Sequence, residues 1–217
     1  MRSIYKIVVC SLLTLSITSC EKDLLEKEQY QKEIYLIGAY NRVWTTEVSY
    51  SNEEVKTYFT VSSSGTLALD RDVNVKMKIN EELVDIYNKK YWTVLNEDKY
   101  YKSLDTDLYS IPSLENTVIK HAEGISTEVP VLIKTASLKI DQSYVIPVEI
   151  ESTTGYPVST SGYKMLVLLK LKNEYSGSYQ MSGHTTLEGE TPKTIQKPKT
   201  IKPLSLIHIS EPTRHAQ

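Results

Sequence analysis

The acidic residues that follow Asp70 have the spacing of a calcium-binding loop. Residues 70–74 read Asp-x-Asp-x-Asn, and Glu81 occupies the twelfth position, where a bidentate carboxylate closes such loops. Val75 takes the sixth position, where the sharp turn requires glycine. The same stretch also alternates like a strand, and a strand cannot curl its carboxylates around one ion. We therefore expect no metal here and no other cofactor.

Motifs of established catalytic classes are missing from the sequence. It contains no His-Glu-x-x-His, no Gly-x-Ser-x-Gly, no Cys-x-x-Cys and no glycine-rich phosphate loop. The aspartate-rich strand end of chitinase-like endoglycosidases is also missing. His121 and His184 are better explained as surface residues than as ligands. We expect that the protein is not an enzyme.

Aromatic side chains are the remaining candidates for binding. The chain has 16 Tyr and 1 Phe, and flat rings hold sugars by stacking against their C–H faces. Trp92, Tyr100 and Tyr101 fall in an irregular segment after a predicted helix, where a binding loop could lie. Trp44 falls in another weakly patterned stretch. The alternative, which we favour for each ring, is that it seals the edge of a core.

Seven short runs of apolar and aromatic residues are predicted to be strands. They cover residues 33–37, 55–61, 73–79, 117–120, 129–135, 145–151 and 164–172. Val73–Ile79 alternates most regularly, and Asn80 then caps a short predicted helix over Glu81–Lys90. Lys164–Lys172 is apolar on both faces and is expected to be central. The pattern predicts an all-β fold, an antiparallel immunoglobulin-like sandwich with one short helix.

Two prolines restrict how the predicted strands can pair. Pro130 and Pro147 carry no N–H for a ladder, so we expect them at strand starts, edges or bulges. The sandwich domain is expected over residues 33–173. After Asn173 the spaced Gly and Tyr residues resemble the opening strand of a new domain. Residues 174–203 are therefore predicted to be the truncated start of a C-terminal β domain.

The N-terminus has the pattern of a lipoprotein signal peptide. Arg2 and Lys6 precede an apolar stretch too short to span a bilayer, and Ile17–Cys20 resembles a bacterial lipobox. Residues 1–19 would be removed and Cys20 acylated, which anchors the chain in the outer membrane. Residues 20–32 form an acidic tether that resembles a surface-export signal, or is simply a solvated linker.

The C-terminal residues 204–217 are predicted to be foreign sequence. Leu204–Arg214 (LSLIHISEPTR) matches one translation frame of a widely used transposon sequencing adapter. The alternative is a genuine C-terminal strand, for which the apolar content suffices. We exclude these residues from the fold.

The composition excludes some classes of protein. The net charge is −2, so the chain lacks the basic footprint of a nucleic-acid-binding protein, and no nucleic acid is expected as a partner. Hydrophobic residues make up 40% and charged residues 24%, which are globular values.

Several motifs resemble one domain family. An alternating strand precedes Leu83-x-x-x-Tyr87-Asn88, a Tyr144-x-x-Pro147-Val148 strand follows, and Tyr175-x-Gly177-x-Tyr179 comes last. These motifs resemble the N-terminal β-sandwich domain of unknown function in starch-utilisation-type (Sus-like) surface glycan-binding lipoproteins. In that family a lipocalin-like C-terminal domain or a catalytic endoglycosidase domain follows.

The resemblance implies a non-catalytic surface lipoprotein of a polysaccharide-utilisation locus that assists glycan capture. Its expected partners are an oligosaccharide, the lipid bilayer, and an outer-membrane importer with its binding lipoprotein. Two alternatives stay open. The chain could be the accessory N-terminal module of a truncated surface glycoside hydrolase, or an interaction module that binds no sugar.

Overall fold

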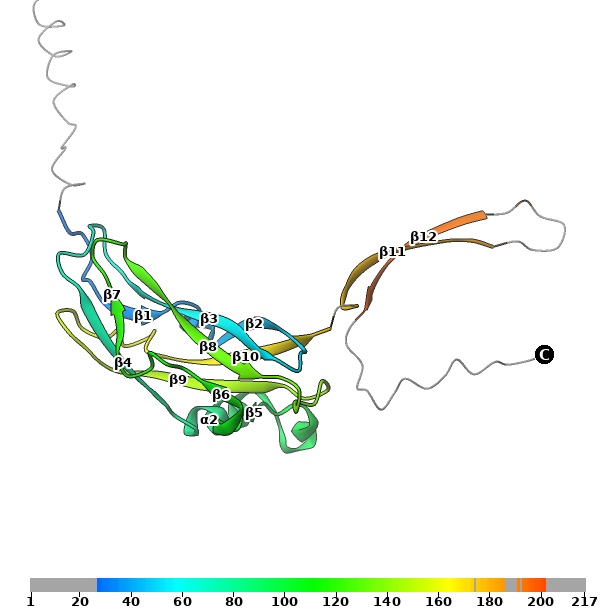
Figure 1. Ribbon diagram of the computed structural model, residues 1–217, viewed down its shortest axis with the longest axis horizontal. Helices are drawn as coiled ribbons and strands as arrows, with labels where there is room; N and C mark the ends of the chain where they lie inside the picture. The colour runs from blue at the N-terminus through cyan, green and yellow to red at the C-terminus, as the bar shows by residue number, and fades with distance from the viewer. Residues whose placement is uncertain (1–26, 174, 186–190, 192, 202–217) are drawn as a thin grey trace, which may run out of the picture.

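Figure 1 shows a computed structural model of the chain, which describes residues 27–173, 175–185, 191 and 193–201. Most of the described chain forms two β-sheets packed against each other. The smaller sheet has the strand order β1 (Ile34–Leu36), β3 (Glu54–Ser63), β8 (Ser126–Lys134) and β6 (Tyr109–Ser110). The larger sheet has the order β2 (Val43–Ser49), β10 (Lys164–Lys172), β9 (Tyr144–Thr153), β4 (Val73–Ile79) and β7 (Thr117–Ile119), and β5 (Lys102–Ser103) also pairs with β9.

Alternating side chains from both sheets form one hydrophobic core. In β4, Val73, Val75 and Met77 are buried, and the residues between them are exposed. The smaller sheet contributes Phe59, Val61, Val129, Val131 and Ile133 to the same core. This pattern buries the facing sides of the two sheets against each other, as in a sandwich. The predicted all-β sandwich is confirmed.

Helix α2 (Glu82–Tyr91) covers part of the outer face of the larger sheet. Leu83 and Val84 pack against Val145 and Leu166 there, away from the main core. This helix explains why β10 is apolar on both faces: Met165 and Val167 face the main core, and Leu166 faces α2. The prediction that 164–172 is a central strand is confirmed, because β10 lies between β2 and β9.

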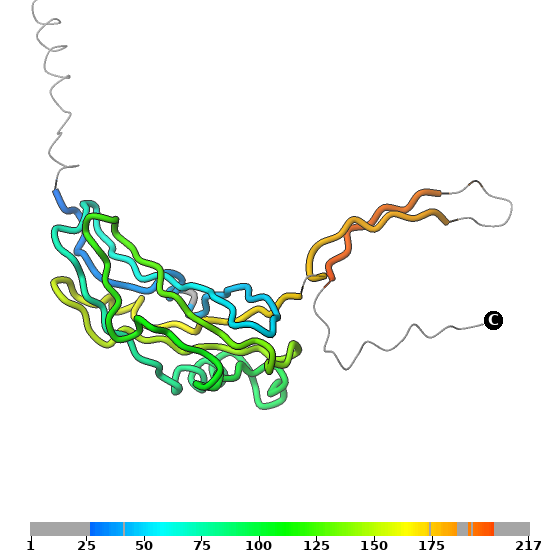
Figure 2. The backbone as a smooth tube through the Cα atoms, in the orientation of Figure 1, coloured from blue at the N-terminus to red at the C-terminus, as the bar shows by residue number. Residues whose placement is uncertain are grey.

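Helix α2 has Glu81 at its N-cap position, one residue after the cap that the sequence predicts, but Asn80 still bonds to the first turn. The Oδ1 of Asn80 accepts a hydrogen bond from the N–H of Glu82 at 3.2 Å, and its carbonyl accepts one from Leu83 at 3.1 Å. Between β4 and β5 the chain leaves the sheet, forms α2 and the 3₁₀ segment η3 (Val94–Lys99), and returns to the same neighbour, β9 (Figure 2).

Pro147 lies at the point where that excursion begins. It is an interior residue of β9, so a strand start is ruled out for it. Its carbonyl accepts a hydrogen bond from the N–H of Asn80 at 3.0 Å, just past the end of β4. Its missing N–H therefore faces the gap between β4 and β5, where no ladder bond is lost. Pro130 lies within β8, where β6 pairs only with Leu132 and Ile133.

Strand β2 differs from the antiparallel expectation. It pairs in parallel with β10, with Val43 opposite Leu166. The chain reaches β2 by crossing from the smaller sheet through Gly38 and the 3₁₀ turn η2 (Ala39–Asn41). Gly38 and Arg42, at the two ends of that turn, have φ of 88° and 63°. Two left-handed residues reverse the chain within one turn and set β2 beside β10.

The last described residues form a separate two-stranded antiparallel sheet. It consists of β11 (Gly177–Thr185) and β12 (Lys193–Ile201), with Tyr179 opposite Lys199. Most side chains of the two strands are exposed. A hairpin of this kind has two faces to cover and is marginal in water without further strands.

Candidate functional site

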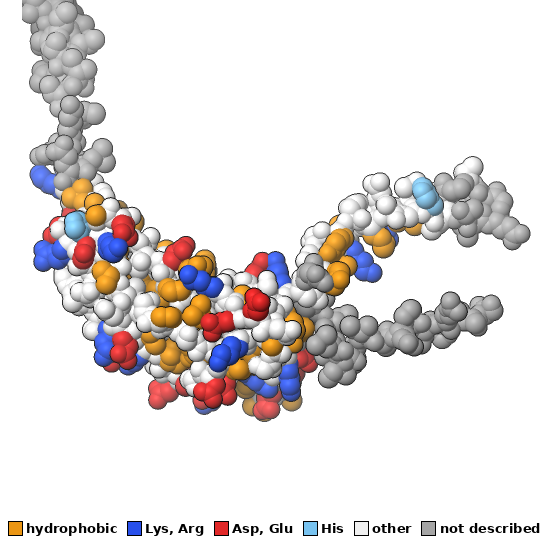
Figure 3. Space-filling view, viewed as in Figure 1, with side chains coloured by type: hydrophobic (Ala, Val, Ile, Leu, Met, Phe, Trp, Pro, Cys, Tyr) orange, Lys and Arg blue, Asp and Glu red, His pale blue; other side chains and the backbone are white. Residues whose placement is uncertain are grey.

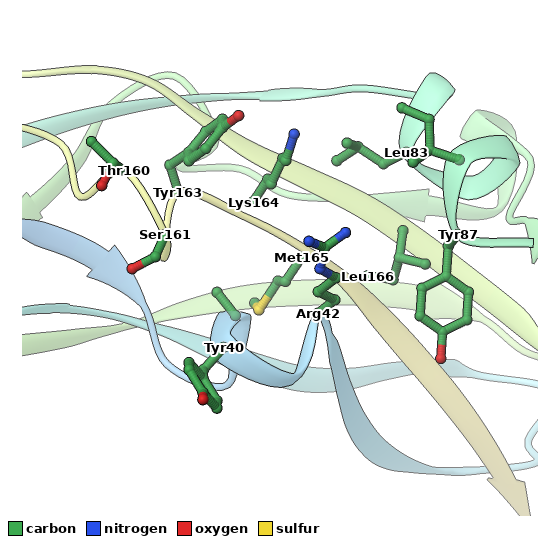
Figure 4. A pocket seen from close by; sticks show the side chains of 12 residues that line it. Tyr40, Arg42, Leu83, Tyr87, Thr160, Ser161, Tyr163, Lys164, Met165 and Leu166 are labelled. Carbon is green, nitrogen blue, oxygen red and sulfur yellow. The ribbon is translucent and has the colours of Figure 1, made fainter. Parts of the chain in front are cut away.

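A cleft of about 440 Å³ lies over the first residues of β10, between α2 and the turn η2 (Figure 4). This volume lies within the range of small-ligand sites, roughly 300–1,000 Å³. The lining residues come from four segments: Ala39, Tyr40 and Arg42; Leu83, Ile86 and Tyr87; Thr160 and Ser161; and Tyr163, Lys164, Met165 and Leu166. Aromatic, hydroxyl and cationic side chains thus face one space, which has no Asp or Glu among its lining residues.

The α2 side of the cleft is held in place by a buried amide. Asn88 is 5% exposed. Its Nδ2 donates to the carbonyl of Tyr101 at 2.9 Å, and its Oδ1 accepts from the N–H of Tyr101 at 2.9 Å. The side chain therefore bonds to the backbone of the returning segment as a neighbouring strand would. This pair fixes the helix to the sheet that it covers.

Tyr87 forms the aromatic wall of the cleft. Its ring stacks on that of Tyr101, with centroids 5.2 Å apart and planes inclined by 11°, and lies 4.5 Å from the ring of Tyr91. Burial, and next the neighbouring Tyr101, raises the pKa of Tyr87 to about 12. The phenol is therefore neutral at physiological pH and stays a hydrogen-bond donor and acceptor.

Two cations, Arg42 and Lys164, line the same space. The backbone brings Arg42, which lies just before β2, next to β10, because Arg42 O accepts from Leu166 N at 2.8 Å. The Nζ of Lys164 lies 4.8 Å from the ring centroid of Tyr163. Within the described part of the chain, neither cation has a carboxylate within 4.0 Å. Both are free to contact a ligand.

Hydroxyl groups complete the cleft. Thr160 and Ser161, in the connection between β9 and β10, and the exposed Tyr40 lie with Tyr163 around its rim. Hydroxyls donate and accept hydrogen bonds, and tyrosine rings add an apolar surface with a polar tip. The arrangement suits a polar ligand that also has apolar patches.

Two family models match the sequence. One is described as an N-terminal domain and matches residues 30–157, more than half of the 217-residue chain. The chain belongs to this N-terminal-domain family. A second model, described as a C-terminal domain, matches residues 163–209. A search of curated proteins found no match.

Solved structures of several Bacteroides proteins share the fold of this chain. A protein of unknown function from Bacteroides ovatus is 20% identical, with a TM-score of 0.54 over 79% of this chain and 57% of its own. Another from the same species is 22% identical, with a TM-score of 0.52 over 77% and 53%. An auxiliary nutrient binding protein from Bacteroides thetaiotaomicron is 16% identical, with a TM-score of 0.50 over 76% and 56%. The chain spans about half the length of these structures.

The four aromatic residues that the sequence suggested for sugar stacking do not line the cleft. They are Trp44, Trp92, Tyr100 and Tyr101. The ring of Tyr101 stacks on that of Tyr87, which lines the cleft. The ring of Trp44, 36% exposed, covers Gly38 at the crossing between the sheets. Trp92 is half-buried; its ring lies 5.7 Å from Lys99 Nζ, and its Nε1 is buried with no hydrogen-bond partner among the described residues. Tyr100 is half-buried beside η3.

Sequence reasoning did not select the residues that line the cleft. Arg42 ends a stretch without periodicity, and Lys164 opens a strand, where a charged residue is ordinary. One signal was available for Tyr87, which belongs to the Leu83-x-x-x-Tyr87-Asn88 motif. That motif supplies Leu83 and Tyr87 to the cleft and Asn88 to its support.

The calcium-like residues take separate partners. Asp70 bonds to Arg71 at 2.9 and 3.0 Å and to the hydroxyl of Tyr156. Asp72 Oδ1 lies 2.6 Å from His121 Nδ1 and accepts the backbone N–H of His121 at 3.0 Å. These contacts lower the pKa of both carboxyl groups. In the described ranges, no three His, Cys, Asp or Glu side chains gather as a metal site would need.

The predicted anchor and adapter segments lie outside the described residues. This holds for the signal at 1–19, for Cys20, for the first part of the tether and for 204–217. The end of the tether is described: Glu28 accepts hydrogen bonds from the N–H groups of Thr66 and Leu67 at 2.5 and 3.3 Å. None of the helices in the described chain is long and apolar enough to cross a bilayer.

Proposed function

We propose that this protein is a non-catalytic lipoprotein that captures glycans on the outer-membrane surface for a polysaccharide-utilisation system. The observation that carries the proposal is the cleft beside α2. It combines Tyr40, Tyr87 and Tyr163 with the hydroxyls of Thr160 and Ser161. Saccharides present apolar C–H faces and many hydroxyls, so a site of this composition matches both of their surfaces.

The fold supports a binding role. Two packed sheets and a helix held by Asn88 keep the cleft residues in fixed positions, so that little ordering is needed on binding. Among proteins that share the fold, one is an auxiliary nutrient binding protein. The absence of established catalytic motifs from the sequence favours capture over hydrolysis.

Lipidation at Cys20 would supply the attachment. In this proposal the acylated residue holds the chain in the outer membrane, and residues 21–32 lead to the sandwich, which Glu28 contacts at Thr66 and Leu67. The cleft would then stand at the cell surface, where it delivers an oligosaccharide to an outer-membrane importer and its binding lipoprotein.

A second function is favoured by the surface next to the cleft. Ile86, Tyr91, Val94 and Leu95 are between 49% and 94% exposed. Exposed apolar groups of this kind occur where proteins contact one another. The alternative is therefore an interaction module that binds a protein of the same uptake system and no sugar. Figure 3 shows the mixed charges and scattered apolar groups on one face of the molecule.

Affinity electrophoresis through gels that contain plant, host and microbial polysaccharides tests the proposal. We expect at least one polysaccharide to retard the protein, and Tyr163→Ala to abolish the retardation. The matched control is Tyr58→Ala, because Tyr58, like Tyr163, has a lysine over its ring but lies on the smaller sheet. Unchanged migration in every gel would favour the interaction module.

Incorporation of an alkyne fatty acid tests the anchor. Cells that express the full chain should label the wild-type protein and leave Cys20→Ser unlabelled. Protease treatment of intact cells should then degrade the labelled protein, because it faces the exterior. A wild-type chain that stays unlabelled contradicts the lipoprotein part of the proposal, and a protected one contradicts surface display.

A further inference from the structure

We propose that the cleft selects acidic saccharides, whose carboxylate or sulfate oxygens bind between Arg42 and Lys164. This inference rests on the proposed glycan-binding function and narrows its ligand class. The two side chains line one concave space, and no Asp or Glu lines it with them. The chain as a whole has a net charge of −2, so a general excess of cations does not explain the two positive side chains at this cleft.

Four other lysines on the larger sheet contrast with these two cations, because each of the four has a carboxylate partner. Lys76 pairs with Glu151 at 2.7 Å, and Lys78 lies 3.8 Å from Glu149. Near the far end of β10, Lys170 lies 3.4 Å from Glu47, which also contacts Lys172. The sheet thus supplies a carboxylate to each of these four lysines. Arg42 and Lys164, at the cleft, are left without one among the described residues.

Glu149 is the residue that would have neutralised Lys164. The two are directly opposite in the register of β9 and β10. The carboxylate of Glu149 is turned the other way, however. Its Oε2 accepts from Asn80 Nδ2 at 2.5 Å, and its Oε1 faces Lys78. The start of α2 therefore binds the one acidic cross-strand neighbour and leaves the ammonium group of Lys164 available.

The backbone of Arg42 adds a second, independent observation. Its φ of 63° lies in the left-handed region, and among the described residues it is the one residue other than glycine with a positive φ. Glycine would adopt this conformation without a steric penalty. An arginine held in a disfavoured conformation at the wall of a cleft is typical of a residue whose side chain has a task there. Its planar guanidinium matches the paired oxygens of a carboxylate or a sulfate.

The remaining lining fits a sugar ring that carries such a group. Tyr163 lies under Lys164, and Thr160 and Ser161 add hydroxyls within the same space (Figure 4). An anion bound by the two cations would bring the ring hydroxyls of the saccharide to these groups. Neutral saccharides would leave both cations unpaired and would bind less tightly.

Isothermal titration of the purified protein with tetragalacturonate and with its methyl ester tests the inference, because esterification removes the negative charges and otherwise adds only methyl groups. A second pair, sulfated and unsulfated dextran oligosaccharides, distinguishes sulfate from carboxylate. We expect one acidic ligand to bind about tenfold or more tightly than its neutral partner. Arg42→Gly and Lys164→Met should each lower that affinity about tenfold, and Lys56→Met, beside Tyr58 on the other sheet, should leave it unchanged.

The outcomes separate the inference from the function on which it rests. If neutral glycans are retarded in a Tyr163-dependent way and acidic ligands show no preference, the inference is overturned and the proposed function stands. If acidic ligands bind equally well to Arg42→Gly, Lys164→Met and Lys56→Met, the binding is non-specific and the inference is again overturned. If no glycan of any kind binds, both proposals fail.

Discussion

Asn88 and Tyr101 exchange two hydrogen bonds, each 2.9 Å long, between a buried side-chain amide and a backbone N–H and carbonyl. This pair joins the last turns of α2 to the segment that returns to the sheet. Because the ring of Tyr101 also stacks on Tyr87, the same contact fixes the aromatic wall of the cleft. The Asn88 side chain thus holds the cleft wall in place by bonding to the backbone of Tyr101 as a neighbouring strand would.

Asn88→Ala should destabilise the protein strongly. It leaves the N–H and carbonyl of Tyr101 without partners, and each unsatisfied buried group costs about 1–3 kcal/mol. We expect the free energy of unfolding in urea to fall by about 2–4 kcal/mol. Asn96→Ala is the control, because Asn96 makes one exposed hydrogen bond to Thr93 and should cost below about 0.5 kcal/mol. Similar losses in the two variants would contradict this role for Asn88.

Gly38→Ala should also be destabilising, through Trp44. The added Cβ would lie 2.6 Å from Trp44 Cε3, at a φ of 88° that disfavours side chains. We expect a loss of about 2–4 kcal/mol in the free energy of unfolding, from backbone strain and overpacking together.

Gly155→Ala isolates the backbone part of that loss. Its φ is 81°, and the atom nearest to an added Cβ would be Cδ of the exposed Arg71 side chain at 3.2 Å, which can shift. Its loss should be about 1–2 kcal/mol. If Trp44→Ala in the Gly38→Ala background recovers none of the difference in a double-mutant cycle, the contact with Trp44 is not the cause.

Arg42→Gly should separate stability from binding. Glycine relieves a left-handed strain of about 1–2 kcal/mol, and its greater unfolded-state entropy offsets about 0.5–1 kcal/mol of that gain. Thermal and urea unfolding should therefore show a free energy that is unchanged or up to about 1.5 kcal/mol higher. Arg42→Ala keeps the strained Cβ and should be the less stable of the two. The reverse order would show that the Arg42 backbone is not strained.

Glu28→Gln should change how stability depends on acid. The ion pair with Lys32, followed by the backbone N–H of Thr66, lowers the pKa of Glu28 from 4.5 to about 2. A carboxyl with a depressed folded-state pKa stabilises the fold above its unfolded-state pKa and loses that contribution as the pH falls. The wild type should therefore be the more stable at pH 7, and the difference should shrink between pH 5 and pH 2. A difference that stays constant over this range would mean that the charge of Glu28 does not hold the tether to the sandwich.

Much of the fold could be predicted from local patterns. The strand Val73–Ile79 has the bounds that its alternation predicts, and Asn80 bonds to the first turn of the helix that follows. The sequence did not indicate β2 (Val43–Ser49), because an edge strand of mixed composition has little periodicity. Its parallel pairing with β10 depends on the left-handed turn at Gly38 and Arg42, and no hydrophobic pattern encodes such a turn.

The sequence by itself determined most of the strands, the faces that they bury and the position of helix α2, because alternation and capping are properties of neighbouring residues. Only the tertiary structure decided which residues share the cleft. Arg42 and Lys164 are far apart in the chain and meet through the pairing of β2 with β10, and Glu149 is turned away by Asn80 at the start of α2. Strand partners are chosen by the packing of the whole core, so the charges that meet across a sheet cannot be predicted from any one segment.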